Sequence, residues 1–395
     1  MGHSFASRAI FIRALYRSFP YISANYYMTA PQTLQQLDRT YVRCGQQKLS
    51  YFSGCDYYRL SSHPGVKNAL KRGLDRYGLN VAASRFTTGD HVLYHELEKS
   101  LAGFFCAKSC VLAPTGYLSN VIAAQALSGN FSHALVDKAS HPSLRAAAQV
   151  LNCPVLEFEH RNPDDLERCI SRCGPGTRIL LLTDGMFSRN GGVAPLDQYK
   201  RRLPKDAWML VDDAHGAGVL GETGRGTLEQ TGVPRQQLIQ TITLSKAFGV
   251  YGGAILGDPS LTKAILTRSH TFAASTPLPL PLTAASLESV KMLKSDATFR
   301  KRLAANTAYV KIGLAPTGII FPELEGPIIM WAPRRSSEIG SLRNKLLKAK
   351  IYPPFIVYPG GPPLGYFRFV MSSEHTRRQL DNLISVLTDF LRKQK

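Results

Sequence analysis

The 395-residue sequence has no long hydrophobic run and no evenly paired, closely spaced cysteines. No apolar stretch approaches the roughly 18 to 20 residues that span a bilayer, so we predict no transmembrane helix and no membrane partner. The seven cysteines are odd in number and scattered, which favours reduced thiols and a cytoplasmic protein. In "CAKSC" and "CISRC" the cysteines are four residues apart without a nearby histidine, so we expect no metal site.

Acidic residues are also scarce: 28 Asp and Glu stand against 48 Lys and Arg, which gives a net charge of +20. The basic residues are spread along the chain and form no RNA- or DNA-binding motif, so we expect no nucleic-acid partner. Two interpretations of the charge remain. One is a basic surface that aids solubility, and the other is attraction of an anionic substrate.

Short apolar runs that end in polar residues or glycine recur with helical patterns between them. Runs of this kind are typical of strands buried on both faces of a sheet, and their alternation with helices predicts an α/β fold with a largely parallel sheet. The strand candidates are "RILLLTD" (178–184), "WMLVDD" (208–213), "QTITLS" (240–245) and "GGAILG" (252–257). Leucine spacing predicts amphipathic helices over 93–105, 282–295 and 377–393.

The alternation of strand and helix candidates ends at about residue 275, where the proline-rich stretch "STPLPLPL" follows. The strand-like segments "PIIMWAP" and "YFRFVMSS" then alternate with helical patterns, which predicts a smaller α+β domain. We therefore divide the chain into an N-terminal segment (1–50), a large cofactor-binding domain (51–278) and a small C-terminal domain (279–395).

Residues 1–27 contain Arg8, Arg13 and Arg17 and no acidic residue. This composition fits a transit peptide, which would place the protein in mitochondria. It fits equally a short amphipathic helix, or an over-long start with the true one at Met28. The sequence leaves these three interpretations open.

Two motifs follow strand candidates and carry reactive side chains. "VDDAHGAG" (211–218) places Asp212 and His215 at a strand end, where ligands bind in open α/β sheets. "TLSKAFG" (243–249) places Lys246 three residues after Thr243. A desolvated lysine has a lowered pKa and can bond to an aldehyde. Taken singly, the motifs also fit an acidic turn with a structural histidine and a lysine that extends from a strand end to solvent.

A third motif, "PTGY", opens a helix, so the backbone N–H groups of Gly116 and Tyr117 are candidates to bind phosphate. Together the three motifs indicate pyridoxal 5'-phosphate. That cofactor needs a lysine, a carboxylate for its ring nitrogen, a phosphate site and a flat group against the ring. His141, in "DKASHPSL", is the candidate for the flat group.

From about Leu37 to its end the sequence resembles the α-oxoamine synthases, which are fold-type I pyridoxal phosphate enzymes. The resemblance rests on eight segments in the family's order and spacing: "HPGV" (63–66), "SRFTTGDHVLYHELEKSLAGF" (84–104), "TGY" (115–117), "DKASHPSL" (137–144), "TDGMFSRNGGVAPL" (183–196), "VDDAHGAGVLGETGRG" (211–226), "TLSKAFGVYGGAIL" (243–256) and "RFVMSSEH" (368–375). It implies a large domain with a mostly parallel seven-stranded sheet flanked by helices, and a smaller C-terminal domain.

The resemblance also implies roles for individual residues. Lys246 would bond to the cofactor aldehyde, Asp212 would face the ring nitrogen, and His141 would stack on the ring. Further cofactor contacts would come from His215, Ser188, Asp184, Thr243, Gly116 and Tyr117. Arg368 and Arg39 would bind substrate. Ser275 and Thr276 would reach the phosphate of a neighbouring subunit, which implies a homodimer with its active site at the interface.

The implied reaction joins an amino acid to an acyl thioester, on coenzyme A or acyl carrier protein, with loss of carbon dioxide. "DDAHGAGVLGETGRG" is closest to the 8-amino-7-oxononanoate synthases of biotin synthesis, which use alanine and a pimeloyl thioester. The sequence departs from the family pattern in "YFSGCDYYRL", where Cys55 and Tyr58 are unusual, in "LNVAASR", and over 351–368. These departures keep a glycine C-acetyltransferase or another paralogue open as alternatives, with an aminotransferase as a more distant one.

Overall fold

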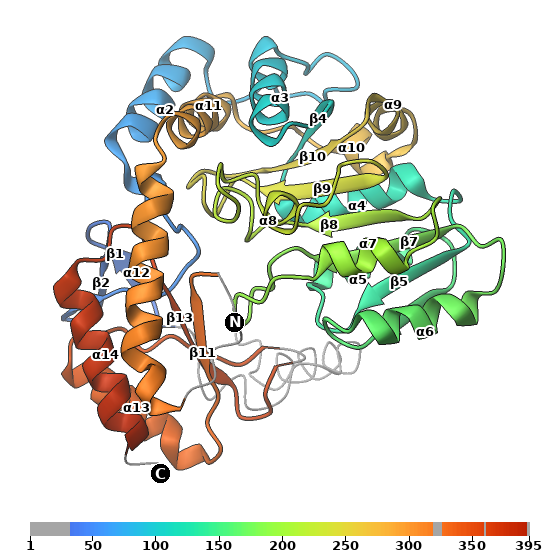
Figure 1. Cartoon of the computed structure of the whole chain (residues 1–395). Helices are drawn as coiled ribbons and strands as arrows, with labels where there is room; N and C mark the ends of the chain where they lie inside the picture. Colours follow the sequence, from blue (N-terminus) through green and yellow to red (C-terminus); the bar gives the residue numbers. More distant parts are fainter. Residues whose placement is uncertain (1–31, 319–325, 359–360, 393–395) are drawn as a thin grey trace, which may run out of the picture.

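The computed structural model describes residues 32–318, 326–358 and 361–392. The segment 1–27, with its three interpretations, lies outside the described residues. In Figure 1 a layered α/β unit forms one part of the molecule, and an assembly of helices with small sheets forms the other. The helices predicted over 93–105, 282–295 and 377–393 are confirmed as α3 (Val92–Phe105), α11 (Leu280–Ser295) and α14 (Arg377–Arg392).

The central sheet has seven strands in the order β4-β10-β9-β8-β7-β5-β6, which confirms the predicted architecture. In this described sheet β10 runs opposite to the other six strands, which share one direction. The sheet therefore presents the carboxyl ends of its other six strands along one edge. The strands are β4 (Ser109–Ala113), β5 (His133–Asp137), β6 (Val155–Phe158), β7 (Ile179–Asp184), β8 (Trp208–Asp212), β9 (Leu238–Thr243) and β10 (Gly253–Gly257).

Helices cover both faces of this sheet, because its central strands are apolar on both sides. In β7, Leu180 and Leu182 belong to one core, while Ile179 and Leu181 belong to the core on the opposite face. The first core is closed by α4 (Gly116–Leu127), α5 (Pro142–Gln149), α9 (Pro259–Arg268) and α10 (His270–Ala274). The second is closed by α6 (Pro163–Cys173), α7 (Leu196–Arg202) and α8 (Thr227–Thr231).

The C-terminal part begins with α11, which packs along α2 (Pro64–Tyr77) and α3 at one end of the sheet (Figure 1). α12 (Thr298–Leu314) then leads to a small antiparallel sheet in the order β11-β13-β12. Its strands are β11 (Ile328–Trp331), β12 (Phe355–Ile356) and β13 (Tyr366–Val370), with α13 (Ser336–Lys348) and α14 packed beside them. Because α11 lies against the large part, the boundary at 278/279 stays a prediction.

Residues 34–50 form a third, antiparallel sheet of β1 (Leu34–Gln36), β2 (Tyr41–Cys44) and β3 (Gln47–Ser50). The backbone N–H of Ser50 donates to Lys350 O at 2.8 Å, and that of Tyr352 donates to Ser50 O at 3.0 Å. The described part of the N-terminal segment therefore packs on the C-terminal part. Among the residues with assigned positions, no helix has the length and apolar character that a bilayer crossing requires.

A tight turn follows β9 and carries Lys246. Its backbone is closed by hydrogen bonds from Gly249 N to Lys246 O and from Val250 N to Leu244 O, both 2.9 Å long. Gly249 has a φ of +66°, and a Cβ there would lie 2.5 Å from Ser61 N. The turn therefore needs glycine both for its conformation and for its packing.

We expect Gly249→Ala to lower the free energy of unfolding by about 2–4 kcal/mol, since left-handed strain adds to steric overlap. Gly129→Ala is the matched control. Gly129 has a φ of +77° but open space around its Cβ position. Its cost should be only about 1–2 kcal/mol. Urea unfolding of the two variants measures the difference, and equal midpoints would contradict the packing argument.

Candidate functional site

A cavity of about 180 Å³ opens at the carboxyl ends of β7, β8 and β9, beside the first turns of α4 and α5. Its position is the one expected for ligand binding in an open α/β sheet. The cavity brings together residues that the sequence places more than a hundred positions apart. Its lining consists of Thr115, Gly116, Tyr117, His141, Ser143, Asp184, Asp212, Ala214, His215, Thr243, Ser245 and Lys246.

Lys246 projects from the turn after β9 and is half-buried. Burial lowers the pKa of its ammonium group, while the nearby Asp212 and Asp184 carboxylates act in the opposite direction. A lowered pKa increases the fraction of neutral amine, which is the form that bonds to an aldehyde or accepts a proton. The environment therefore favours covalent and acid–base chemistry at this lysine.

Asp212 ends β8 and is 6% exposed. Its Oδ2 accepts hydrogen bonds from Asn120 Nδ2 at 2.6 Å and Ser143 Oγ at 3.4 Å, and its Oδ1 accepts one from Ala214 N at 3.1 Å. These donors offset the cost of burying a carboxylate. A buried carboxylate that is held by hydrogen bonds from the protein can keep a proton on the ring nitrogen of a bound cofactor.

Asp184 ends β7 and lies in register with Asp212. Burial raises the pKa of the Asp184 carboxyl well above its ordinary value, and the charge of Asp212 raises it further. Asp184 Oδ2 accepts a hydrogen bond from the backbone N–H of His141 at 2.8 Å. Asp184 therefore fixes the chain at the start of α5 and, with it, the position of the His141 ring.

His141 caps α5 through its ring nitrogen Nδ1, which accepts from Ser143 N at 3.2 Å and contacts Ser143 Oγ at 2.7 Å. The Tyr117 ring meets the His141 ring edge-on, with centroids 6.3 Å apart. The imidazole is therefore held on the cavity wall from two sides. That geometry suits the predicted role of a flat group against a cofactor ring.

His215 follows β8 and is 5% exposed. Burial lowers the pKa of its imidazole well below the ordinary value, and the charges of Lys246 and Arg368 lower it further. Its Nδ1 is hydrogen-bonded to the Tyr57 hydroxyl at 2.8 Å. The neutral ring is therefore anchored on one side by Tyr57 and lines the cavity with the other.

The start of α4 forms a phosphate-sized cradle. Thr115 Oγ1 caps Leu118 N at 3.1 Å, while the N–H groups of Gly116 and Tyr117 have no hydrogen-bond partner within the described chain. A Cβ at Gly116 would lie 2.7 Å from Thr243 Cβ, so only glycine allows this close approach. The hydroxyls of Thr243 and Ser245 lie 2.7 Å apart at the same wall.

This donor set tests the fit of pyridoxal 5'-phosphate. Two unused N–H groups at a helix start and two hydroxyls suit a phosphate, and the glycine cradle leaves room for it. Lys246, Asp212 and His215 supply the amine, the carboxylate and the ring-oxygen partner that the rest of the cofactor needs. The residues present therefore fit the cofactor.

Arg368 lies on β13, is 8% exposed and reaches the site from the C-terminal part. Its Nε donates to the backbone oxygen of Ser188 at 2.6 Å, and its Nη2 donates to Cys55 Sγ at 3.3 Å. Neither Arg368 nor Ser188 is part of the cavity lining, and their predicted roles at the substrate carboxylate and the cofactor ring stay predictions. Ser188 contributes its carbonyl to this contact.

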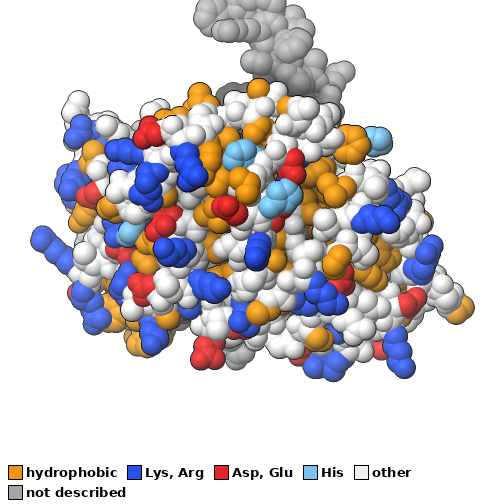
Figure 2. Space-filling view, turned by 90° about the horizontal axis from the view of Figure 1, so that it is seen from above, with side chains coloured by type: hydrophobic (Ala, Val, Ile, Leu, Met, Phe, Trp, Pro, Cys, Tyr) orange, Lys and Arg blue, Asp and Glu red, His pale blue; other side chains and the backbone are white. Residues whose placement is uncertain are grey.

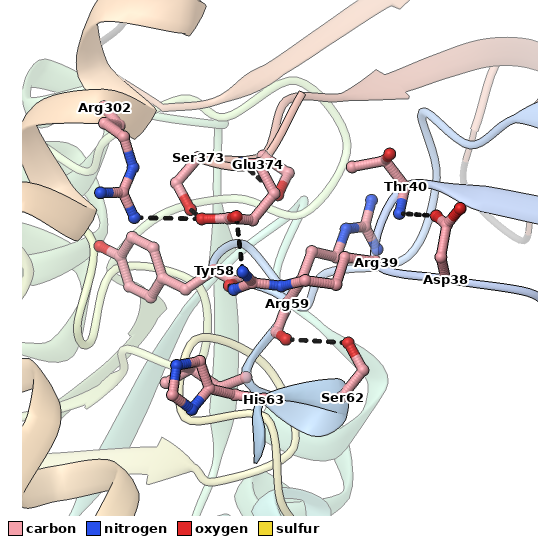
Figure 3. A network of polar contacts seen from close by, with 12 residues as sticks. Asp38, Arg39, Thr40, Tyr58, Arg59, Ser62, His63, Arg302, Ser373 and Glu374 are labelled. Carbon is pink, nitrogen blue, oxygen red and sulfur yellow. Dashed lines mark hydrogen bonds and ion pairs between the residues drawn. The ribbon is translucent and has the colours of Figure 1, made fainter. Parts of the chain in front are cut away.

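Arg39, Ser275 and Thr276 lie outside the lining of this cavity. Figure 3 shows Arg39 in a polar network with Glu374 and Arg302; Arg39 Nη1 pairs with Glu374 Oε2 at 2.7 Å. Ser275 is the C-cap residue that follows α10, and Thr276 is exposed. The predicted roles of these three residues stay predictions.

The motifs did not identify four residues that shape the site, namely Asn120, Ser143, Tyr57 and Cys55. Asn120 and Ser143 look like ordinary polar residues of helices, and only the fold brings them to Asp212. The one available signal was the departure of "YFSGCDYYRL" from the family pattern. It marked Cys55, which the structure places against Arg368.

Comparison with known proteins agrees with this geometry. The sequence profile described as "Aminotransferase class I and II" matches residues 52–387. The 8-amino-7-oxononanoate synthase of Thioalkalivibrio sulfidiphilus is 33% identical over 351 residues, which cover 88% of this chain and 89% of that protein.

Two solved structures share the fold. Serine palmitoyltransferase from S. paucimobilis with bound PLP has a TM-score of 0.87 and 22% identity, with 99% of each chain covered. The 8-amino-7-oxononanoate synthase of Francisella tularensis has a TM-score of 0.76 and 22% identity, with 88% of this chain and 98% of that chain covered. With a fitting cofactor site and relatives that match most of its length, the chain belongs to the α-oxoamine synthases, the pyridoxal phosphate-dependent acyltransferases within aminotransferase class I and II.

Proposed function

We propose that this enzyme condenses alanine with a pimeloyl thioester, with loss of carbon dioxide, to form 8-amino-7-oxononanoate for biotin synthesis. The observation that carries the proposal is the cavity in which Lys246, with its lowered pKa, faces Asp212 and His215 beside a phosphate cradle. Relatives named for this activity, 30–33% identical over most of the chain, support the choice of substrates.

The residues of the chain divide the work. The bound cofactor supplies an aldehyde and an electron-withdrawing ring. Asp212 would hold the proton of the ring nitrogen, and the amine of Lys246 would remove the Cα proton of the amino acid as general base. Arg368 binds the carboxylate of the amino acid, for which its planar, doubly donating guanidinium is suited. His141, which lines the cavity, would cover one face of the ring.

The acyl-binding surroundings have diverged more than the cofactor site. Among the described residues, the departures over 51–60, 79–85, 351–358 and 361–368 lie outside the cavity lining. One of them, Tyr57, is hydrogen-bonded to His215 of the lining. A glycine C-acetyltransferase or another paralogue therefore remains the principal alternative. The aminotransferase alternative shares Lys246 and Asp212 and differs in releasing no thiol.

We also propose that the enzyme is a cytoplasmic homodimer. All seven cysteines are free thiols, in keeping with a reducing compartment. In the segment between α2 and α3, Leu79 is 68% exposed and Phe86 is 63% exposed, and Val92 at the start of α3 is 60% exposed. Arg85 anchors this segment through bonds to Asp90 and Glu98. The face that carries α2, α3 and α11 has hydrophobic side chains open to solvent between basic ones (Figure 2).

The first test concerns Lys246. We expect Lys246→Ala to lower the rate of thiol release from alanine and pimeloyl-coenzyme A by at least about a thousandfold, since covalent anchor and base are lost together. Lys200→Ala is the matched control, because burial also lowers the pKa of Lys200, which bonds Gln237 outside the cavity. A Lys246 variant that matches this control would refute the proposal.

The second test identifies the substrates. Thiol release is measured with a chromogenic thiol reagent for alanine, glycine and serine against acetyl, pimeloyl and palmitoyl thioesters of coenzyme A and acyl carrier protein. We expect alanine with the pimeloyl thioester to give the highest kcat/KM, and the gene to restore growth of a biotin auxotroph that lacks this step. Preference for glycine and acetyl would favour the acetyltransferase, and transamination without thiol release the aminotransferase.

The third test concerns the dimer. Replacing Phe86 by Glu removes apolar contact worth about 1.5–3 kcal/mol, so the dissociation constant of the dimer should rise by about tenfold to a hundredfold. Ile312→Glu is the control, because Ile312 is 72% exposed on α12, away from this segment. Sedimentation over a concentration series measures both variants. Equal dissociation would exclude the segment from the interface.

A further inference from the structure

A thiol lies against the arginine that the proposed function assigns to the substrate carboxylate. Cys55 Sγ accepts a hydrogen bond from Arg368 Nη2 at 3.3 Å, while Arg368 Nε is fixed to Ser188 O at 2.6 Å. The guanidinium is thus oriented from two sides before any substrate arrives. One of its two anchors can ionise.

The segment that carries Cys55 is itself firmly placed. Phe52 O accepts from Val370 N at 2.9 Å, and Tyr57 O accepts from Ser373 N at 3.0 Å, so the segment follows the end of β13. Cys55 therefore has a fixed position relative to Arg368, and its contact with the guanidinium does not depend on a mobile loop.

Cationic groups dominate the surroundings of Cys55. Arg368 from β13, Lys246 from the turn after β9, and Arg59 from its own segment interact with it, and the Tyr57 side chain is hydrogen-bonded to it. Burial raises the pKa of the Cys55 thiol, but the charges of Arg368 and Lys246 and the bonds from Arg368 and Tyr57 together bring it below its ordinary value. The surroundings therefore stabilise a thiolate.

We propose that Cys55 is a positioning residue for the amino-acid substrate: its thiolate is the resting counter-ion of Arg368, and the substrate carboxylate displaces it. The inference rests on the proposed function, since it takes Arg368 as the carboxylate-binding group. Two anions cannot share one guanidinium at low cost. Binding of the carboxylate is therefore coupled to uptake of one proton by Cys55 Sγ.

This coupling fixes the sign of a pH effect. Below the pKa of Cys55 the thiol is neutral, and Arg368 is available to the carboxylate. Above that pKa the thiolate competes, so the KM for the amino acid should rise by at least about threefold between a pH below the pKa of Cys55 and a pH above it. The KM for the acyl thioester should show no such rise, because its binding does not use Arg368.

The experiment measures the KM of both substrates against pH for the holoenzyme and for Cys55→Ser and Cys55→Ala. A serine hydroxyl can hold Arg368 without ionising in this range, so Cys55→Ser should lose the pH-dependent rise and keep a low KM. Cys55→Ala removes the anchor, so its KM should be raised at every pH. Cys153→Ser, a half-buried thiol outside the cavity, should retain the wild-type profile.

The variant Arg368→Lys distinguishes a failure of the role of Cys55 from a failure of the role of Arg368. If this variant raises the KM for the amino acid while Cys55→Ser keeps the wild-type pH profile, the role of Cys55 is wrong and that of Arg368 stands. If Arg368→Lys leaves the KM unchanged, the assignment of Arg368 fails, and the inference about Cys55 fails with it. A flat profile in the wild-type enzyme also overturns the inference.

Discussion

The site depends on one buried carboxylate, that of Asp212, which hydrogen bonds hold in place inside the protein. Asp212 is almost fully buried, and Asn120 Nδ2 donates to it at 2.6 Å. The Asn120 amide is oriented in turn, because its Oδ1 accepts from Thr241 Oγ1 at 2.6 Å on the neighbouring strand. Removal of one partner that leaves a buried donor or acceptor without a hydrogen bond costs about 1–3 kcal/mol. These hydrogen bonds therefore fix the position of α4 relative to the sheet, and with it the position of the Asn120 amide that holds the carboxylate.

The neighbouring Asp213 stabilises the loop that follows β8. Asp213 accepts hydrogen bonds from Thr227 N at 2.9 Å, Thr227 Oγ1 at 2.6 Å and Gln240 Nε2 at 2.7 Å. A Cβ at Gly226 would lie 1.9 Å from its Oδ2, so glycine there makes room for the carboxylate. Consecutive residues at a strand end point to opposite sides. One aspartate thus faces the cavity, while the other closes the loop that holds His215.

The sequence was sufficient for the features that lie within short segments. The parallel sheet followed from its apolar runs, and Lys246, Asp212 and His215 followed from motifs at strand ends. Asn120 and Tyr57 could not be recognised in the same way, because their function depends on contacts 92 and 158 residues away along the chain. No local pattern encodes such distances. Residues expected to act across a subunit boundary, such as Thr276, need the second chain.

The amino-acid end of the site is built from both parts of the molecule. Arg368 comes from a strand paired on both sides, and Cys55 comes from a segment hydrogen-bonded along the end of that strand. Lys246 comes from the turn that follows β9 of the large sheet. Any shift of the C-terminal part against the large part therefore moves the carboxylate-binding arginine relative to the lysine. The distance between Arg368 and Lys246, and so the size of amino acid that fits between them, depends on the packing of the two parts and not on either motif alone.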